Sequence, residues 1–336
     1  MKKLSGLFIV IILLVSCAKE TEQAKRFSGE ALGTTYSVQF FSENDLNFEK
    51  AMDSIIDEIN TSMSTYTTKS DISRINRGDS TVKVDEHFRK VFKASEKIFK
   101  ESNGFFDPTV GVLVNAYGFG PEKRLMEIDS VTLDSLHALV GFDKLTLNAD
   151  NTIGKENPLI YLDFNAIAKG YAIDVIAEYL EKNEVENYLI ELGGELRARG
   201  NNLTNSSEWI VGIDDPLQME GNRSLYAKLK LENTAMATSG NYRKYRVDSL
   251  SGERYVHTVN PLTGKAEKSN LLSTSVLAEN CMLADGYATA FMALGLERSK
   301  EMLNHLNGVE VYMIYSAENG DVEVFSSQGF EKQLVE

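Results

Sequence analysis

The stretch LIYLDFNAIAKGYAIDVIAEYLEKN, residues 159–183, contains two patterns of secondary structure in succession. Its first six residues, 159–164, are mostly apolar and predict a buried strand. The rest predicts a helix, because apolar residues recur every four positions along one face. The residues of that face are Ile167, Tyr171, Val175 and Tyr179. The stretch therefore predicts a strand that runs directly into a helix.

Two charged residues mark this junction. Asp163 stands at the end of the expected strand, and Lys169 stands in the first turns of the expected helix. Strand ends that open into helix N-termini are common ligand edges, because free N–H groups and the helix dipole face outward there. Lys169 could contact a phosphate as a point charge. The alternative is an ordinary helix start, with Asn165 as its cap and Lys169 exposed.

Outside this stretch, strands and helices mix without a strict βαβ rhythm. Strands are expected at 34–41, 187–200 (two strands joined at a double glycine), 209–216, 225–233 and 271–278, and helices at 47–64, 84–104 and 280–295. This order favours an α+β fold with mixed or antiparallel sheet cores flanked by helices. No repeat or long linker divides the chain, so residues 28–336 are expected to form one domain.

The N-terminus predicts export. Residues 1–17 combine two lysines with an apolar run that is too short to span a membrane and is typical of a signal peptide. The run closes on LVSC, which resembles the lipobox of bacterial lipoproteins, whose cysteine, here Cys17, is acylated. An exported lipoprotein, anchored by palmitate-type chains on the periplasmic side of the bacterial cell membrane, is therefore expected. Residues 18–27 would be a polar tether; the alternative is an ordinary signal peptide with a chance cysteine.

The composition limits the partners. The 336 residues carry 35 Lys and Arg against 49 Asp and Glu, a net charge of −14, and no basic cluster stands out. A nucleic-acid-binding face needs such a cluster to displace counterions, so nucleic acid is not an expected partner. The sequence also contains no GxxxxGK[ST] loop and no GxGxxG loop after a strand. A phosphorylated ligand would need a metal ion or local positive charge instead.

The segment ADGYAT, residues 284–289, suggests how a metal could be held. Asp285 and Thr289 are four residues apart, so a helix places them on one face. A carboxylate and a hydroxyl offer two hard oxygens, which suit Mg²⁺ because it usually takes few protein ligands. The alternative is an ordinary Asp at a helix start and a Thr packed within the helix.

Two further segments have open interpretations. HTVNPLTG, residues 257–264, predicts a turn after a strand. His257 either acts there as a base toward a hydroxyl or simply braces the turn. FDPTVGVLVNAYGFG, residues 106–120, is either a piece of core or a wall for a flat aromatic ligand.

Taken together, the segments resemble the FAD:protein FMN transferase (ApbE) family over nearly all of residues 28–330. The resemblance is carried by nine motifs in order: LGTTYSV, STYTTKSDISRIN, SNGFFDPTVGVLVNAYGFG, LDFNAIAKGYAID, ELGGELRARG, WIVGIDDP, ATSGNYRKY, HTVNPLTG and ADGYATAFMALG. It implies an ApbE-like α+β fold and a Mg²⁺-dependent transferase. Such an enzyme moves the FMN half of FAD onto a Ser or Thr hydroxyl of a partner protein and releases AMP.

The resemblance also implies roles for individual residues. The metal would be held by the Asp285 and Thr289 side chains and by the Ala166 carbonyl. His257 would be the base for the acceptor hydroxyl. The FAD site would be lined by Leu32, Tyr66, Phe105, Phe106, Asp107, Asp163, Lys169 and Val259.

Departures from the family pattern and competing functions remain open. The family usually has Met at Leu32, Asp at Glu195 and Asp-Pro-Arg at residues 260–262, which are Asn-Pro-Leu here. The implied partners are exported or membrane redox proteins with an FMN-binding domain, such as subunits of sodium-pumping or related electron-transport complexes. The alternatives are a Mg²⁺-dependent FAD pyrophosphatase that gives FMN and AMP, or a flavin-binding lipoprotein without catalysis.

Overall fold

The computed structural model describes residues 23–122, 124–125, 128–218, 222–240, 245–247, 254–256, 259–265 and 269–335. Its centre is an eight-stranded sheet in which every neighbouring pair of strands is antiparallel. In spatial order the strands are β1 (Lys25–Ala31), β2 (Thr34–Phe41), β5 (Asn187–Leu192), β6 (Glu195–Arg199), β9 (Ala235–Gly240), β12 (Leu271–Ala278), β13 (Glu310–Ser316) and β14 (Val322–Ser326). The expected α+β class with an antiparallel sheet core is confirmed.

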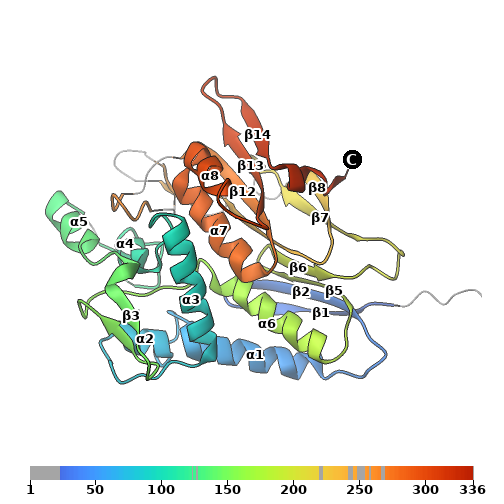
Figure 1. Ribbon diagram of the computed structural model, residues 1–336, viewed down its shortest axis with the longest axis horizontal. Coiled ribbons are helices and arrows are strands. Elements are labelled where there is room, and N and C mark those ends of the chain that lie inside the picture. Colours follow the sequence, from blue (N-terminus) through green and yellow to red (C-terminus); the bar gives the residue numbers. More distant parts are fainter. Residues whose placement is uncertain are drawn as a thin grey trace, which may run out of the picture.

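Helices cover one face of this sheet (Figure 1). α6 (Ala168–Lys182) and α7 (Cys281–Leu294) lie side by side on it, and α1 (Phe48–Met63) and α3 (Glu86–Glu101) pack against them. The smaller helices are α2 (Asp71–Asn76), α4 (Gly111–Ala116), α5 (Ser130–His137), α8 (Leu296–Leu303), α9 (Gln328–Glu331), and the 3₁₀ turns η1 (Pro108–Val110) and η2 (Phe142–Lys144). Within the described part of the chain, no helix has the length and apolar character to cross a membrane.

The other face of the sheet packs on a second apolar cluster. A three-stranded sheet of β7 (Trp209–Asp214), β8 (Leu225–Leu231) and β15 (Leu334–Val335) supplies part of that cluster, with Trp209 and Leu229 among its buried side chains. Side chains on a strand alternate between faces, so in β9 Met236 joins this cluster while Ala235 and Ala237 join the helical one. The remaining strands form the pairs β3 (Leu145–Leu147) with β4 (Ile153–Lys155) and β10 (Tyr245–Val247) with β11 (Arg254–Val256).

The predicted strand at 159–164 is wrong, although the burial that suggested it is real. Ile160, Leu162 and Phe164 are fully buried at alternate positions, but the segment pairs with no strand of the described residues. The Asn76 side chain takes the place of a strand, because its amide donates to the Leu162 carbonyl and accepts from the Leu162 N–H, both at 2.8 Å. An alternating apolar pattern indicates which side chains are buried. It does not indicate which group forms hydrogen bonds with the backbone of the segment.

The helix that follows also differs from its prediction. It begins at Ala168, after a turn, with Ile167 rather than Asn165 at the cap position and no side-chain cap. Its buried surface is wider than the predicted stripe, because sheet, α1 and α7 all pack around it. Val175 and Tyr179 of that stripe are only half-buried, whereas the fully buried members include Ala172, Ile173, Ile176, Ala177 and Leu180.

The expected boundary between tether and domain lies three residues too late. β1 begins at Lys25, so residues 25–27 belong to the sheet rather than to a tether. Phe27 explains the difference, because its ring centroid lies 5.7 Å from that of Phe40 and 4.8 Å from that of Phe48. Cys17 and the predicted signal peptide lie outside the described residues.

Candidate functional site

The candidate site is built where the first turns of α6 and α7 cross, and Gly170 makes that crossing possible. An added Cβ at Gly170 would collide with the carbonyl oxygen of Cys281 and would lie 2.9 Å from the Cβ of Asp285. The Gly170 N–H donates to Oδ2 of Asp285 at 3.0 Å. The close approach of the two backbones therefore places the Asp285 carboxylate over the start of α6.

Three oxygen-bearing groups that could bind a metal lie beside this crossing: the Asp285 carboxylate, the Thr289 hydroxyl and the Ala166 carbonyl. Thr289 lies one turn after Asp285 on α7, and its Oγ1 is 3.5 Å from the Ala166 carbonyl oxygen, just before α6. Oγ of Ser239, at the end of β9, is also 3.5 Å from Oγ1 of Thr289. The structure thus brings together the carboxylate, hydroxyl and carbonyl that the sequence pointed to, from segments more than a hundred residues apart.

A lysine and a second carboxylate complete the polar cluster. Nζ of Lys169 lies 2.7 Å from Oε1 of Glu195 and 3.7 Å from Oδ1 of Asp285. The Lys169 side chain keeps 29% of its exposure, so a ligand can reach it, whereas Glu195 is buried. Oε2 of Glu195 is buried and has no hydrogen-bond partner among the residues that the structure describes, so the cluster has unused acceptor capacity there.

The electrostatics of the cluster favour a bound cation. Burial raises the pKa of Asp285 to about 7, an effect that Lys169 opposes and Glu195 reinforces. Burial lowers the pKa of Lys169, but Asp285 and Glu195 outweigh it and the net shift is upward. Two buried carboxylates facing one ammonium leave negative charge that a metal ion would offset.

The donor set fits Mg²⁺ better than a transition metal. No group of three or more His, Cys, Asp and Glu side chains forms a metal centre among the residues that the structure describes. The oxygens at the crossing are instead one carboxylate, one hydroxyl and one backbone carbonyl. Hard oxygens in small number suit Mg²⁺, which completes its shell with water and substrate oxygens.

A second group of predicted residues lies along the segment that enters α6. Gly111 packs directly on this segment, since an added Cβ would lie 2.9 Å from the Cβ of Asp163. Asp163 accepts the Asn165 N–H at 2.7 Å, and burial raises its pKa to about 6. Burial and, to a smaller extent, the charge of Asp163 raise the pKa of Tyr66, a residue that is still 66% exposed. Tyr66 is thus an accessible aromatic surface near Asp163.

Three of the residues predicted to line the FAD site have structural contacts in the fold: Phe105, Phe106 and Asp107. The two phenylalanines are buried in the helical core. Oδ1 of Asp107 accepts the Thr109 N–H at 2.7 Å and the Thr109 hydroxyl at 2.6 Å, and Oδ2 accepts the Phe142 N–H at 3.1 Å. The Asp107 side chain is therefore a brace for η1 and η2, and its contact with FAD stays a prediction.

Leu32 lies in the two-residue turn between β1 and β2. Leu32 and Gly33 both adopt positive φ, 51° and 76°, which a tight hairpin requires and which is unusual for a leucine. The neighbouring β5–β6 turn touches this hairpin, because the Gly193 N–H donates to the Thr35 carbonyl at 3.0 Å. Glu195 follows that turn directly. Leu32 therefore belongs to the same edge of the sheet as Glu195.

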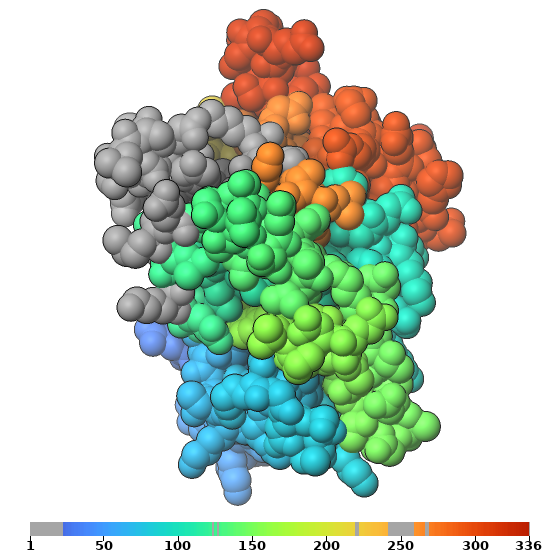
Figure 2. Space-filling view, turned by 90° about the vertical axis from the view of Figure 1, so that its left-hand side faces the viewer, coloured from blue at the N-terminus to red at the C-terminus, as the bar shows by residue number. Residues whose placement is uncertain are grey.

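Val259 and the loop that follows it contact the α4–α5 region. Figure 2 shows this side of the molecule, where the orange residues of the loop border the green segment around α4 and α5. Val259 packs with Leu113 and Val140. His137 holds the loop through Nε2, 2.7 Å from the Pro261 carbonyl oxygen. The predicted turn is confirmed at Asn260, whose carbonyl accepts the Gly264 N–H at 2.8 Å, whereas His257 lies outside the described residues.

Sequence reasoning missed several residues that shape this site. Gly170 and Asp174 were treated as parts of an ordinary helix, and Glu195 only as a departure from a pattern. Asp174 carried a signal, because it is a lone charge with Ala172, Ile173, Val175 and Ile176 around it. Its buried carboxylate contacts the start of α7.

Comparisons with known proteins agree with the fold and the motifs. The sequence matches the ApbE family over residues 32–313. It is 36% identical over 347 residues to the FAD:protein FMN transferase of Haemophilus influenzae, with 99% of this chain and 98% of that protein covered. The corresponding identity to the FAD:protein FMN transferase of Vibrio cholerae is 35% over 325 residues, with 94% and 95% covered.

Solved structures give the same result. The flavin transferase ApbE from Vibrio cholerae superposes with a TM-score of 0.82 at 32% identity, covering 93% of this chain and 99% of its own. The ApbE protein from Thermotoga maritima superposes with a TM-score of 0.79 at 27% identity, covering 94% and 100%.

Proposed function

Because the chain belongs to the ApbE family, we propose that it is an FAD:protein FMN transferase that modifies a Ser or Thr hydroxyl of a partner protein. The observation that carries the proposal is the convergence at the α6–α7 crossing. Asp285, Thr289 and the Ala166 carbonyl supply oxygens there, and Lys169 supplies an accessible ammonium. This combination can offset the charge of a pyrophosphate in a sequence that contains neither of the two glycine-rich phosphate loops.

The chain's own residues account for binding and orientation. Asp285, Thr289 and the Ala166 carbonyl would hold Mg²⁺, and a bound Mg²⁺ supplies positive charge against the pyrophosphate oxygens. The ammonium of Lys169 would move away from Glu195 and contact a phosphate oxygen as a point charge. The exposed ring of Tyr66 offers a surface on which an aromatic ring of FAD can lie.

The transfer of FMN requires one bond to form, one bond to break and one base to take a proton. The acceptor oxygen forms a bond to the FMN phosphorus, and the bond between that phosphorus and the bridging oxygen of FAD breaks. AMP leaves with the bridging oxygen, and His257 takes the proton of the acceptor hydroxyl. The role of His257 rests on its motif, HTVNPLTG, because the residue lies outside the described part of the chain.

The site of action is part of the proposal. Residues 1–17 would direct export, and acylated Cys17 would hold the enzyme on the periplasmic side of the bacterial cell membrane. The acceptor would then be an exported or membrane redox protein with an FMN-binding domain, of the kind found in sodium-pumping and related electron-transport complexes. The folded domain begins close after the anchor, since β1 starts at Lys25.

The intact mass of an acceptor domain tests the proposal. A purified FMN-binding domain from the same cell is incubated with residues 18–336, FAD and Mg²⁺, in parallel with an Asp285→Ala variant. We expect the acceptor to gain the mass of FMN less water with the wild type only. AMP and free FMN with an unchanged acceptor would identify a pyrophosphatase instead. FAD that stays bound and intact with every acceptor tried would identify a flavin-binding protein.

A further inference from the structure

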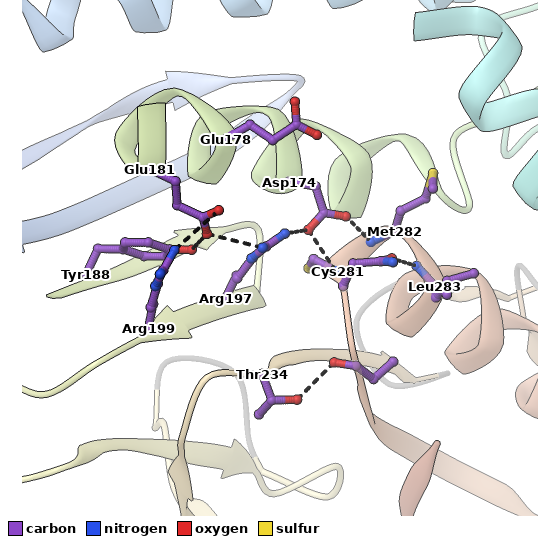
Figure 3. A network of polar contacts seen from close by, with 12 residues as sticks. Asp174, Glu178, Glu181, Tyr188, Arg197, Arg199, Thr234, Cys281, Met282 and Leu283 are labelled. Atoms are coloured by element: carbon purple, nitrogen blue, oxygen red, sulfur yellow. Dashed lines mark hydrogen bonds and ion pairs between the residues drawn. The ribbon is translucent and has the colours of Figure 1, made fainter. Parts of the chain in front are cut away.

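The two helices at the candidate site cap each other. The Asp285 carboxylate of α7 accepts the Gly170 N–H at the start of α6. In return, the Asp174 carboxylate of α6 accepts the N–H groups of Cys281 and Met282 at the start of α7, at 2.9 and 2.8 Å. Figure 3 shows Asp174 pointing from its helix to these two residues. Each helix therefore supplies a carboxylate to the free N–H groups of the other.

Asp174 is held in place from the sheet. Arg197 on β6 forms an ion pair with it at 2.6 Å, and Arg197 also lies 3.3 Å from Glu181, two turns further along α6 (Figure 3). Asp174 is only 6% exposed. Burial raises its pKa, and the two N–H groups and Arg197 oppose that rise. Such a buried and paired carboxylate has little freedom to move.

We infer that Asp174, held by Arg197, is a positioning residue that fixes the start of α7 against the start of α6 and so sets the metal-binding geometry. The inference rests on the proposed function, because the geometry in question is that of Asp285 and Thr289 relative to the Ala166 carbonyl. Asp174 is not one of the groups assigned to the metal, so its proposed role is to position them.

The spacing explains why this contact matters for binding rather than only for folding. One residue of helix advances 1.5 Å, and Mg²⁺ requires oxygens at about 2.1 Å in near-octahedral geometry. A slide of α7 by a fraction of a residue would leave the helix intact and still spoil the oxygen set. The side chain of Asn280 accepts the Leu283 N–H, further along the first turn of α7. Asp174 is thus the carboxylate that ties the first two residues of α7 to α6.

The test measures metal affinity directly. Mn²⁺, as a probe for the Mg²⁺ site, is titrated into the folded wild type and the Asp174→Asn variant, and free Mn²⁺ is counted by electron paramagnetic resonance. We expect the variant to bind Mn²⁺ roughly tenfold more weakly, the usual effect of removing a residue that orients metal ligands. Competition by Mg²⁺ identifies the site.

Two further variants separate positioning from general stability. Glu181→Gln removes the carboxylate charge that Arg197, Arg199 and Tyr188 face in the same network, and it leaves the contacts with α7 in place. Its Mn²⁺ affinity should therefore equal that of the wild type. Asp174→Glu keeps the charge beside Arg197 and shifts the carboxylate by one methylene. If Asp174→Asn does not fold, judged by circular dichroism and gel filtration, Asp174→Glu takes its place and should show the same loss of affinity.

The remaining outcomes contradict the inference in distinguishable ways. Wild-type affinity in the folded Asp174 variant would show that Asp174 does not position the ligands. Equal losses in the Asp174 and Glu181 variants would assign the effect to stability. A wild type that binds no Mn²⁺ would remove the metal site of the proposed function, and this inference with it.

Discussion

Asp107 and Asp285 are both buried carboxylates in motifs of the same family, but the fold treats them differently. Asp107 receives three hydrogen bonds, two from Thr109 and one from Phe142. Asp285 receives one backbone N–H, from Gly170, and faces Lys169 at 3.7 Å. Burial raises the pKa of both, to about 7 for Asp285.

The difference separates a brace from a site. Both oxygens of Asp107 accept hydrogen bonds from nearby residues of η1 and η2. Its carboxylate therefore stabilises these two short turns. Asp285 can still bind a cation, and it lies beside Glu195, whose Oε2 has no partner within the described part of the chain. A buried carboxylate with unused capacity is a functional candidate, whereas a saturated one is more simply structural.

The largest expected effect is the loss of activity on Asp285→Asn. Removing the carboxylate should lower the rate of FMN transfer at least about 1,000-fold, because several kcal/mol of charge stabilisation disappear with the metal. The thermal midpoint should change little, since the Asn oxygen can still accept the Gly170 N–H. Acceptor mass against time and thermal unfolding measure the two effects. A variant with near wild-type transfer would place the metal elsewhere.

The next effect tests the backbone contact under Asp285. Gly170→Ala should lower the free energy of unfolding by about 3 kcal/mol, because the new Cβ meets the rigid carbonyl of Cys281. It should also weaken Mn²⁺ binding. Gly154→Ala is the control, because its nearest atom would be 3.6 Å away. If urea titration gives the same free energy of unfolding for both variants, the α6–α7 crossing can move apart to accept a Cβ at Gly170.

The structural role of Asp107 is tested by Asp107→Ala. Three buried donors would lose their acceptor, so the free energy of unfolding should fall by about 2–3 kcal/mol. Asp129→Ala is the control, because it removes an exposed cap that accepts one N–H, from Thr132, and it should lower the free energy of unfolding by less than Asp107→Ala does. Urea titration gives both values. Mn²⁺ affinity should stay at the wild-type level in folded Asp107→Ala, and its loss would make Asp107 part of the metal site.

The smallest effect is a pH dependence from Asp163. Its pKa of about 6 lies above the ordinary 3.8, so the folded protein holds this proton more tightly than the unfolded chain. The resulting stabilisation is complete below about pH 4 and is lost as the pH rises through 6. Because the side chain is only partly buried, the free energy of unfolding relative to Asp163→Asn should fall by about 1–2 kcal/mol between pH 4 and 7. A difference that is constant with pH would contradict the raised pKa.

Much of the secondary structure could be predicted because it follows local periodicity. The strands predicted at 34–41 and 271–278 match the observed bounds of β2 and β12, and the spacing of four residues placed Asp285 and Thr289 on one face of α7. The segment 159–164 failed for a physical reason. Its alternating burial is real, but its hydrogen-bond partner is the side chain of Asn76, 86 residues away from Leu162.

The sequence by itself determined the α+β class, the ApbE family and the identity of the oxygens that could hold a metal. These depend on patterns within one helix or strand and on ordered motifs. The tertiary structure alone decided that Gly170 lets two helix starts touch, and that Asp174 and Asp285 cap each other's helices. Those contacts join residues 107 to 115 positions apart. No local pattern specifies them, because they form only when the sheet and both helices pack together.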